Sequence, residues 1–188
     1  MRILLTATNR HQRLMSRMNA YPAPIGLAYI AGYLDPDRHD VKILDLMFSE
    51  DYLEETGRTV REFQPDLIGI SLRNLDNVSY MDPQWALPGT KEVIDKIRSI
   101  TEAPIVCGGP GFSLLPEACF DYLGLDLGVA GDGGESFAQL ADAMESGETY
   151  HNMPGLVYRD DTGSIVRKGL AYSQFSKPPL LDQLDMAR

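Results

Sequence analysis

Cysteine is scarce in this chain of 188 residues, which contains only Cys107 and Cys119. Two cysteines separated by eleven residues match no spacing that binds zinc or an iron–sulfur cluster. A chain of this length can bury a hydrophobic core without disulfides. We therefore expect two buried thiols in a reducing compartment and predict that the protein is cytoplasmic.

Long hydrophobic runs and an excess of positive charge are also missing. No apolar stretch reaches the roughly 18 residues of a membrane span, so we expect none. The first residues, MRILLTATNRH, are too briefly apolar for a signal peptide. Lys and Arg number 17 against 27 Asp and Glu, which gives a net charge of −10 and argues against binding to nucleic acid.

The sequence offers few groups for catalysis. Of its three histidines, His39 and His151 lie in turn-like segments where we expect them to be solvated, and His11 follows the first predicted strand without a carboxylate partner. No nucleophile–base pair, paired-carboxylate site or metal-binding cluster can be assembled from the pattern. The sequence favours a binding module, and we expect this chain not to be catalytic by itself.

Short apolar, β-branched segments alternate with longer segments of helical spacing, which is typical of an α/β protein. We expect strands over 2–7, 41–46, 66–71, 104–108 and 126–131, and helices over 25–34, 52–64, 89–100, 116–124 and 135–147. This pattern predicts a doubly wound, flavodoxin-like or Rossmann-like, five-stranded parallel sheet with helices on both faces. Ligands of such folds bind beyond the carboxyl ends of the strands.

The alternation ends near residue 150, and we assign residues 1–150 to the ligand-binding domain. Residues 151–170 contain two short β-like runs around a DDTG turn and predict a β-hairpin that extends this domain. Residues 171–188 contain prolines and lack periodicity. We interpret them as a linker towards a further domain.

The most unusual motif is CGGPGFS, which directly follows the fourth predicted strand. One glycine there would indicate a tight turn and nothing more. Because Gly108, Gly109 and Gly111 come together at the carboxyl end of a strand, we favour contact with a flat, bulky ligand. No Lys, Ser or Thr follows in phosphate-loop spacing.

A second glycine motif, GVAGDGGESF, follows the fifth predicted strand. Gly131 and Gly133 flank Asp132, which with Glu135 can cap the following helix as a capping-box variant. The same residues can also border a ligand, and the two roles are compatible. The spacing does not meet the G-x-G-x-x-G fingerprint of dinucleotide-binding folds.

Two long loops, 8–24 and 72–88, follow the first and third predicted strands. Loops of this length in a compact domain are usually functional or disordered. Ser71 ends the third strand and is the best single candidate for a hydrogen bond to a ligand. Arg73 and Asn74, which follow it in the loop, are further candidates. All four strand-end loops should gather at one edge of the sheet.

Taken in order, the segments PAPIGLAYIAGYL, VKILDL, PDLIGIS, IVCGGPGFS, GVAGDGGESF and PGLVYRD resemble the N-terminal cobalamin-binding domain of cobalamin-dependent radical S-adenosylmethionine enzymes. The resemblance covers about residues 1 to 185. It implies that a corrin ring lies on the carboxyl edge of the sheet and that its dimethylbenzimidazole tail descends beside the strands. Gly108 and Gly109 would leave room for this tail, Ser71 would donate a hydrogen bond to it, and Gly131 and Gly133 would border the nucleotide.

The resemblance and the strand-end positions together give the candidate cofactor-binding residues. They are Thr8, Asn9, Tyr21, Pro24, Gly26, Ser71, Leu72, Arg73, Asn74, Gly108, Gly109, Pro110, Gly111, Phe112, Gly131, Asp132, Gly133 and Glu135.

The sequence departs from other cobalamin proteins at the motif D-x-H-x-x-G, whose histidine ligates cobalt from below. Aligning Gly26 with the motif glycine places Tyr21 at the Asp and Ala23 at the His. The resemblance therefore implies cobalamin bound base-off without a histidine, and we assign no metal ligand to this chain.

Radical S-adenosylmethionine enzymes also need a C-x-x-x-C-x-x-C motif, which is absent here. S-adenosylmethionine and the [4Fe-4S] cluster would then belong to a radical S-adenosylmethionine domain, in cis or in trans, that carries out methyl transfer or cyclisation.

Other functions compete with this interpretation. A flavodoxin-like domain that binds flavin or another nucleotide would have the same fold, although no Ser/Thr-rich phosphate loop follows the first strand. A hydrolase or nucleotide-sugar enzyme would need a nucleophile or base that the pattern lacks, and a scaffold would retain no ligand. The ligand that the protein retains separates these alternatives.

Overall fold

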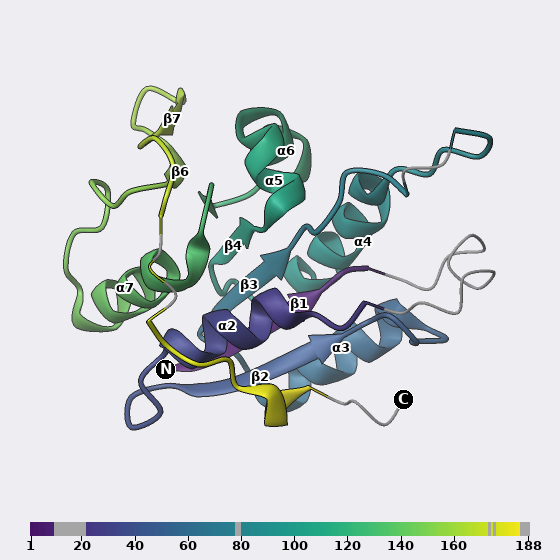
Figure 1. Cartoon of the computed structure of the whole chain (residues 1–188), viewed down its shortest axis with the longest axis horizontal. Coiled ribbons are helices and arrows are strands. Elements are labelled where there is room, and N and C mark those ends of the chain that lie inside the picture. The colour runs from purple at the N-terminus through teal and green to yellow at the C-terminus, as the bar shows by residue number, and fades with distance from the viewer. Residues whose placement is uncertain (10–21, 78–79, 173, 175, 185–188) are drawn as a thin grey trace.

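The computed structural model describes residues 1–9, 22–77, 80–172, 174 and 176–184 (Figure 1). Within them, seven strands form one sheet in the order β2-β1-β3-β4-β5-β6-β7. The five parallel strands are β1 (Arg2–Ala7), β2 (Asp40–Asp45), β3 (Leu67–Ser71), β4 (Ile105–Gly108) and β5 (Leu127–Val129). The predicted doubly wound fold is confirmed.

The strand count differs from the prediction because the C-terminal hairpin joins the sheet. Strands β6 (Leu156–Arg159) and β7 (Ile165–Arg167) pair with each other, and β6 also pairs antiparallel to β5. An uncovered β5 would present unpaired backbone groups, and the hairpin satisfies them. The sheet therefore continues past its parallel part instead of ending at β5.

Helices cover both faces of the sheet (Figure 1). On one face, α2 (Ile25–Tyr33) and α7 (Gly133–Ser146) pack over a core that includes Ile3, Leu5 and Val106. The opposite face carries the second core cluster, and its helices are α3 (Tyr52–Phe63), α4 (Ala86–Arg98) and α6 (Pro116–Leu123). The main cavity of the described residues lies on the face that α2 and α7 cover.

The glycine-rich segment after β4 contains a short helix, α5 (Pro110–Leu114), where the sequence predicted only a loop. Gly109 has φ of 99°, a left-handed conformation that glycine adopts without strain, and Pro110 then occupies the first helical turn. The helix has 5 residues, too few for a periodic pattern. Helix α4 begins at Ala86, ahead of the predicted residue 89, and Pro88 lies in its first turn, where a missing N–H is tolerated.

The segment after β7, which we interpreted as a linker, packs against the domain. The backbone N–H of Leu180 donates to the carbonyl of Ala28 in α2 at 2.9 Å. A 3-10 turn, η1 (Leu181–Gln183), follows, and Leu184 is buried. The described part of this segment is therefore held against α2.

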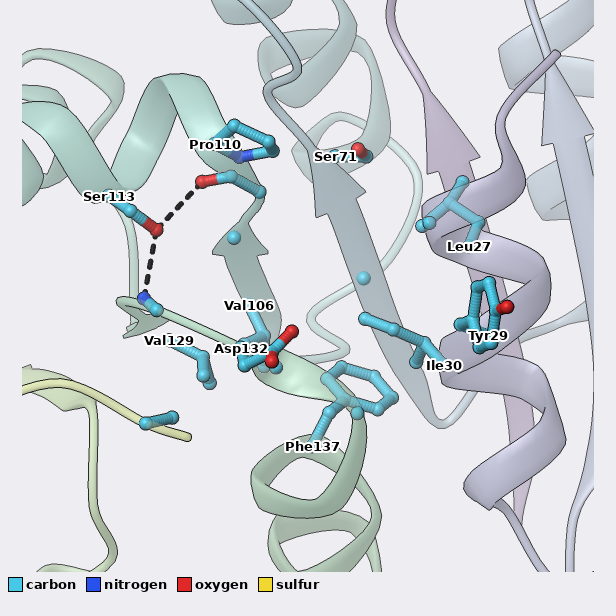
Figure 2. A pocket seen from close by; sticks show the side chains of 18 of the residues that line it. Leu27, Tyr29, Ile30, Ser71, Val106, Pro110, Ser113, Val129, Asp132 and Phe137 are labelled. Atoms are coloured by element: carbon cyan, nitrogen blue, oxygen red, sulfur yellow. Dashed lines mark hydrogen bonds between the residues drawn. The ribbon is translucent and has the colours of Figure 1, made fainter. Parts of the chain in front are cut away.

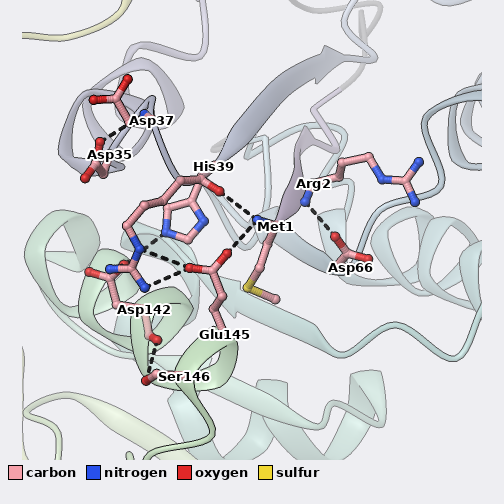
Figure 3. A network of polar contacts seen from close by, with 10 residues as sticks. Met1, Arg2, Asp35, Asp37, His39, Asp66, Asp142, Glu145 and Ser146 are labelled. Carbon is pink, nitrogen blue, oxygen red and sulfur yellow. Dashed lines mark hydrogen bonds and ion pairs between the residues drawn. The ribbon is translucent and has the colours of Figure 1, made fainter.

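A polar network lies at the amino edge of the sheet (Figure 3). Glu145 of α7 accepts hydrogen bonds from the amino group of Met1 at 2.9 Å and from Arg38 Nη2 at 2.7 Å. His39 Nε2 lies 3.1 Å from an Asp142 oxygen, and the ring is only 4% exposed. The expectation of a solvated His39 was wrong, because the turn before β2 folds against α7.

Candidate cofactor site

A cavity of about 510 Å³ opens at the carboxyl edge of the sheet, between the strands and helices α2 and α7 (Figure 2). Its walls include Ser71 and Gly108, which are paired at the ends of β3 and β4. They also include Leu5, Gly69 and Val106, which form one row across three strands. That row lies two residues further in, so the cavity reaches about 7 Å down the face of the sheet.

Two strand residues in the cavity wall have no side chain. Gly69 and Gly108 sit on adjacent strands and both line it. A Cβ added to Gly69 would lie 2.7 Å from Leu5 Cδ2 and 3.3 Å from the Phe137 ring, so these two cavity-lining side chains would have to shift. At Gly108 the nearest atom would be the Val129 carbonyl oxygen at 3.2 Å, so a side chain there would also occupy part of the space.

The walls are mostly apolar. Figure 2 shows Leu27 and Ile30 of α2 on the side of that helix nearest Val106 of β4, with Phe137 of α7 below them, and Tyr29 of α2 also lines the cavity. Among the described residues, the lining contains no lysine, arginine or histidine, and Asp132 is its one charged group. The cavity suits a bulky, uncharged, largely apolar group and offers no counter-charge to a phosphate.

The glycines at 109 and 111 have a structural explanation. An added Cβ would lie 2.8 Å from the Leu72 carbonyl oxygen at Gly109, and 2.9 Å from both that oxygen and the Asn74 carbonyl carbon at Gly111. The N–H of Gly111 also donates to the Leu72 carbonyl at 2.9 Å. Close packing of the loop after β3 therefore requires these two glycines, and Gly108 is the one in this motif that opens the cavity.

Ser113 of α5 connects the two glycine-rich loops (Figure 2). Its hydroxyl donates to the Gly109 carbonyl at 2.9 Å and accepts from the Gly131 N–H at 2.9 Å. One side chain thus fixes the distance between the loops after β4 and β5. Ser113 itself also lines the cavity.

Asp132 precedes α7 at the N-cap position, but its side chain makes no capping hydrogen bond. The capping interpretation of this residue was therefore wrong. Its carboxylate lies on the cavity wall instead (Figure 2), where it can accept a hydrogen bond from a ligand hydroxyl.

Comparison with known proteins agrees with this geometry. Residues 14–141 match the family of B12 binding domains. The chain belongs to the B12-binding domain family. The family resemblance predicted from the sequence is thereby confirmed.

Several relatives of this B12-binding domain are methyltransferases. It is 33% identical over 166 residues to the tryptophan 2-C-methyltransferase of Streptomyces laurentii, a match that covers 85% of this chain and 26% of that protein. It is 26% identical over 163 residues to the cytidylyl-2-hydroxyethylphosphonate methyltransferase of Streptomyces wedmorensis, a match that covers 76% of this chain and 28% of that protein. The domain thus spans about a quarter of the length of these relatives.

Solved structures give the same fold. The radical S-adenosylmethionine methyltransferase TsrM from Kitasatospora setae, with cobalamin and a [4Fe-4S] cluster bound, superposes with a TM-score of 0.78 at 29% identity, covering 95% of this chain and 31% of that chain. The cobalamin-dependent S-adenosylmethionine radical enzyme OxsB, with aqua-cobalamin and S-adenosylmethionine bound, superposes with a TM-score of 0.75 at 18% identity. The superposition covers 96% of this chain and 24% of the OxsB chain, and at this identity it supports the fold alone.

The structure places part of the predicted cofactor-binding set in the cavity wall. The predicted residues that line it are Gly26, Ser71, Gly108, Gly109, Pro110, Gly131, Asp132 and Gly133.

Other predicted residues lie outside the lining. Leu72 and Phe112 are buried in the hydrophobic core, and Thr8 is buried with its hydroxyl 2.9 Å from that of Thr90. Gly111 packs on the loop after β3. The remaining predicted residues are Asn9 and Pro24, which are partly exposed, and Arg73, Asn74 and Glu135, which are exposed. Tyr21, like His11, lies outside the described residues.

The sequence interpretation missed most of the apolar wall. Leu27, Tyr29, Ile30 and Tyr33 come from α2, and Phe137 comes from α7. Their spacing is that of an ordinary helix packing on a sheet, so the sequence carries no signal that separates wall residues from core residues. Gly69, in the middle of a predicted strand, was a usable signal because glycine there often marks a close approach of another group.

Neither cysteine offers a thiolate to a metal. Both are free and buried. Burial raises the pKa of the Cys107 thiol far above its ordinary value, and burial also raises that of Cys119. Both side chains behave as small apolar groups in the core under the sheet.

Proposed function

We propose that this domain binds cobalamin base-off, with the nucleotide tail in the cavity and no histidine beneath the cobalt. The observation that carries the proposal is an apolar channel, the cavity that runs along β3 and β4 past Gly69 and Gly108. It runs inward from the carboxyl edge, where ligands of doubly wound folds bind. A corrin ring at that edge would send its tail into this channel.

Several residues would hold the tail. Tyr29 and Phe137 provide aromatic surface on opposite helices, against which a flat heterocycle can pack (Figure 2). Ser71 lies at the mouth of the cavity and offers a hydroxyl that can donate to a ring nitrogen. Asp132 would accept a hydrogen bond from a sugar hydroxyl. The apolar walls exclude water from around these contacts.

The sequence has no histidine at the position of the D-x-H-x-x-G histidine. Ala23 occupies the position that corresponds to the histidine of the D-x-H-x-x-G motif. The described histidines, His39 and His151, are outside the cavity lining. We therefore propose that no imidazole of the described residues ligates the cobalt.

Bound cobalamin would supply a carrier for a methyl group or a partner in radical chemistry. The residues described above bind, orient and shield it, and none of them is positioned as an acid, base or nucleophile towards a substrate. We propose that catalysis requires a radical S-adenosylmethionine domain with its own iron–sulfur cluster, in cis or in trans. The relatives support this view because this domain matches only 26% and 31% of two of them.

Two further properties belong to the proposal. The two free, buried cysteines support a reducing location, which we propose is the cytoplasm. No helix in the described part of the chain has the length and apolar character needed to cross a membrane.

The test is retention of ligand. The purified chain, mixed with hydroxocobalamin and passed through a desalting column, should emerge as a coloured complex with one cobalamin per chain. Parallel samples with FMN and with ATP should emerge without ligand, because the cavity lining has no cation to bind their terminal phosphates, which carry more charge than the single phosphodiester of the cobalamin tail. A colourless protein after hydroxocobalamin, or one that retains FMN, would contradict the proposal.

A further inference from the structure

The chain after β7 returns to the cavity and forms part of its wall. Leu170, Ala171 and Tyr172 all line it. The Ala171 N–H donates to the Ala130 carbonyl at 2.8 Å, and the Asp132 N–H donates to the Ala171 carbonyl at 2.8 Å. Ala171 is thus fixed beside the loop after β5. We call residues 170–184 the strap; residues 173 and 175 within it lie outside the described part of the chain.

The strap passes so close to two glycines that its backbone occupies the place of a side chain. Gly131 has φ of 98°, and a Cβ added there would lie 2.3 Å from the Ala171 carbonyl oxygen. Gly155 has φ of 78°, and its added Cβ would lie 2.7 Å from the Ala171 nitrogen. The strap therefore excludes a side chain at Gly131, and at Gly155 it does so together with the Ala130 carbonyl oxygen, which would lie 2.5 Å from the added Cβ.

Further along, the strap contacts the opposite wall of the cavity. The Ser176 N–H donates to the Tyr33 hydroxyl at 2.9 Å, and Tyr33 itself lines the cavity. An added Cβ at Gly32 would lie 2.0 Å from the Pro178 carbonyl oxygen, so α2 is also shaped to receive the strap. The described residues of the strap thus connect the loop after β5 with α2, the two sides between which the cavity opens.

The exposed side chains of the strap have the chemistry of a binding surface. Tyr172 is 82% exposed and Leu170 is 42% exposed, although both border a largely apolar cavity. Apolar and aromatic surface of this kind gains free energy when a ligand removes it from water. The match to the family of B12 binding domains ends at residue 141, so it does not include these residues.

We propose that the strap completes the cofactor site, and that Tyr172 packs on the flat heterocyclic part of the bound ligand. This inference rests on the proposed function, because the ligand is taken to be cobalamin.

The first experiment measures hydroxocobalamin binding to the full chain and to Tyr172→Ala. Loss of the ring should weaken binding by roughly fivefold to tenfold, chiefly through faster dissociation. Tyr172→Phe should stay within about twofold, because packing by the ring and not its hydroxyl is required. Tyr122→Ala, which removes another exposed tyrosine from α6 outside the cavity lining, should bind like the wild type.

The outcomes separate the two proposals. A wild-type chain that retains no cobalamin contradicts the proposed function itself. A wild-type chain that retains cobalamin beside a Tyr172→Ala variant of equal affinity contradicts the role of the strap alone.

A second experiment displaces the strap without changing a residue of the cavity wall. Gly32→Ala adds a methyl group that collides with the Pro178 carbonyl, so the strap must move away from α2. Chymotrypsin should then cleave after Tyr172 faster than in the wild type, and cobalamin should dissociate faster. Gly57→Ala on α3 is the matched helix control, because its added methyl group meets only flexible side-chain ends such as Lys96 Cε.

In the wild type, hydroxocobalamin should slow the cleavage after Tyr172 by at least about fivefold, since a packed ring is withdrawn from the protease. Cleavage at the same rate with and without bound cobalamin would overturn the inference.

Discussion

Helices α2 and α7 are linked by charged groups at the amino edge of the sheet and border the cavity at its carboxyl edge. At the amino edge, Arg38 and His39 follow α2 and bind Asp142 and Glu145 near the end of α7 (Figure 3). At the carboxyl edge, the first residues of both helices face the cavity, among them Gly26 and Gly133. The same pair of helices is therefore joined by ion pairs at one end and lines the cavity at the other.

This difference separates two tasks. Ion pairs at the amino edge are partly exposed and contribute little stability each, but they fix how the two helices sit on the sheet. The carboxyl edge has glycines and apolar side chains that leave space for a ligand. Changes at the carboxyl edge should alter binding more than folding, and changes at the amino edge should do the reverse.

Gly26→Phe should have the largest effect on binding. Nothing lies within 4 Å of a Cβ added at Gly26, so the protein tolerates the side chain, but Gly26 lines the cavity and the ring would occupy its mouth. We expect hydroxocobalamin affinity to fall by at least about tenfold. The melting temperature should stay equal or rise, because glycine is a poor helix former.

Binding is measured by equilibrium dialysis and stability by circular dichroism. Glu62→Phe, at an exposed position of α3, controls for the added aromatic surface and should leave the affinity unchanged. If Gly26→Phe binds cobalamin as tightly as the wild type, the cavity is not the site.

The two glycine-rich motifs located the ligand-binding edge of the sheet, but they did not reveal why each glycine is needed there. Gly108 and Gly131 were identified from the sequence as positions bare of side chains, and both line the cavity. The cause, however, differs from one glycine to the next. Gly111 is required by the loop after β3 and Gly131 by Ala171, contacts between segments far apart in the sequence. A sequence pattern registers that a side chain is missing but not which neighbour excludes it.

The parallel part of the fold was predictable because each strand and helix carries its own periodicity. The strap was not, because Leu170 to Tyr172 belong to no periodic element and are held by backbone hydrogen bonds that any residue can make. Phe112 lies outside the cavity lining for a related reason. It follows the glycines of the loop, but α5 turns its side chain into the core, against the space that Gly128 leaves open.

Ser113→Ala should have the next largest effect, because it breaks the contact that ties the two glycine-rich loops together. The N–H of Gly131 would lose its partner, and unpaired donors of this kind cost about 1 to 3 kcal/mol. We expect affinity for hydroxocobalamin to fall about fivefold. In the chain without ligand, hydrogen exchange at the Gly131 amide should become faster.

The matched control is Ser146→Ala, which removes a hydroxyl that donates to the Asp142 carbonyl at the other end of α7. It should leave both affinity and Gly131 exchange unchanged. Unaltered exchange in Ser113→Ala would show that this hydroxyl does not hold the loops.

Asp132→Ala tests whether this N-cap residue serves the ligand and not the helix. Its side chain makes no capping hydrogen bond, so the melting temperature should not change. Affinity for hydroxocobalamin should fall about threefold, the effect of one lost hydrogen bond. Asp51→Ala should give the opposite result, because Asp51 accepts from the Glu54 N–H at 2.9 Å and caps α3. A fall in melting temperature without a change in affinity for Asp132→Ala would reverse the assignment.

Glu145→Gln should have the smallest effect and act at the amino edge. The amino group of Met1 and the guanidinium of Arg38 lower the pKa of Glu145 below its ordinary value of 4.5. The charged form is therefore favoured by folding, and its contribution is present above pH 4.5 and is lost as the pH falls through the lowered folded value. At pH 7 the variant should melt at most about 3 °C below the wild type, because these pairs are exposed to solvent.

The difference in melting temperature should disappear at acid pH, where Glu145 is protonated in the wild type as well. Hydroxocobalamin affinity at pH 7 should stay within about twofold, since the network and the cavity lie at opposite ends of α7. Glu148→Gln, just beyond the end of α7, is the control for removing one acidic charge from this region. A large loss of cobalamin binding in Glu145→Gln would mean that the ion pairs at the amino edge also set the width of the cavity. In that case, breaking these pairs would shift α2 and α7 relative to each other along their whole length.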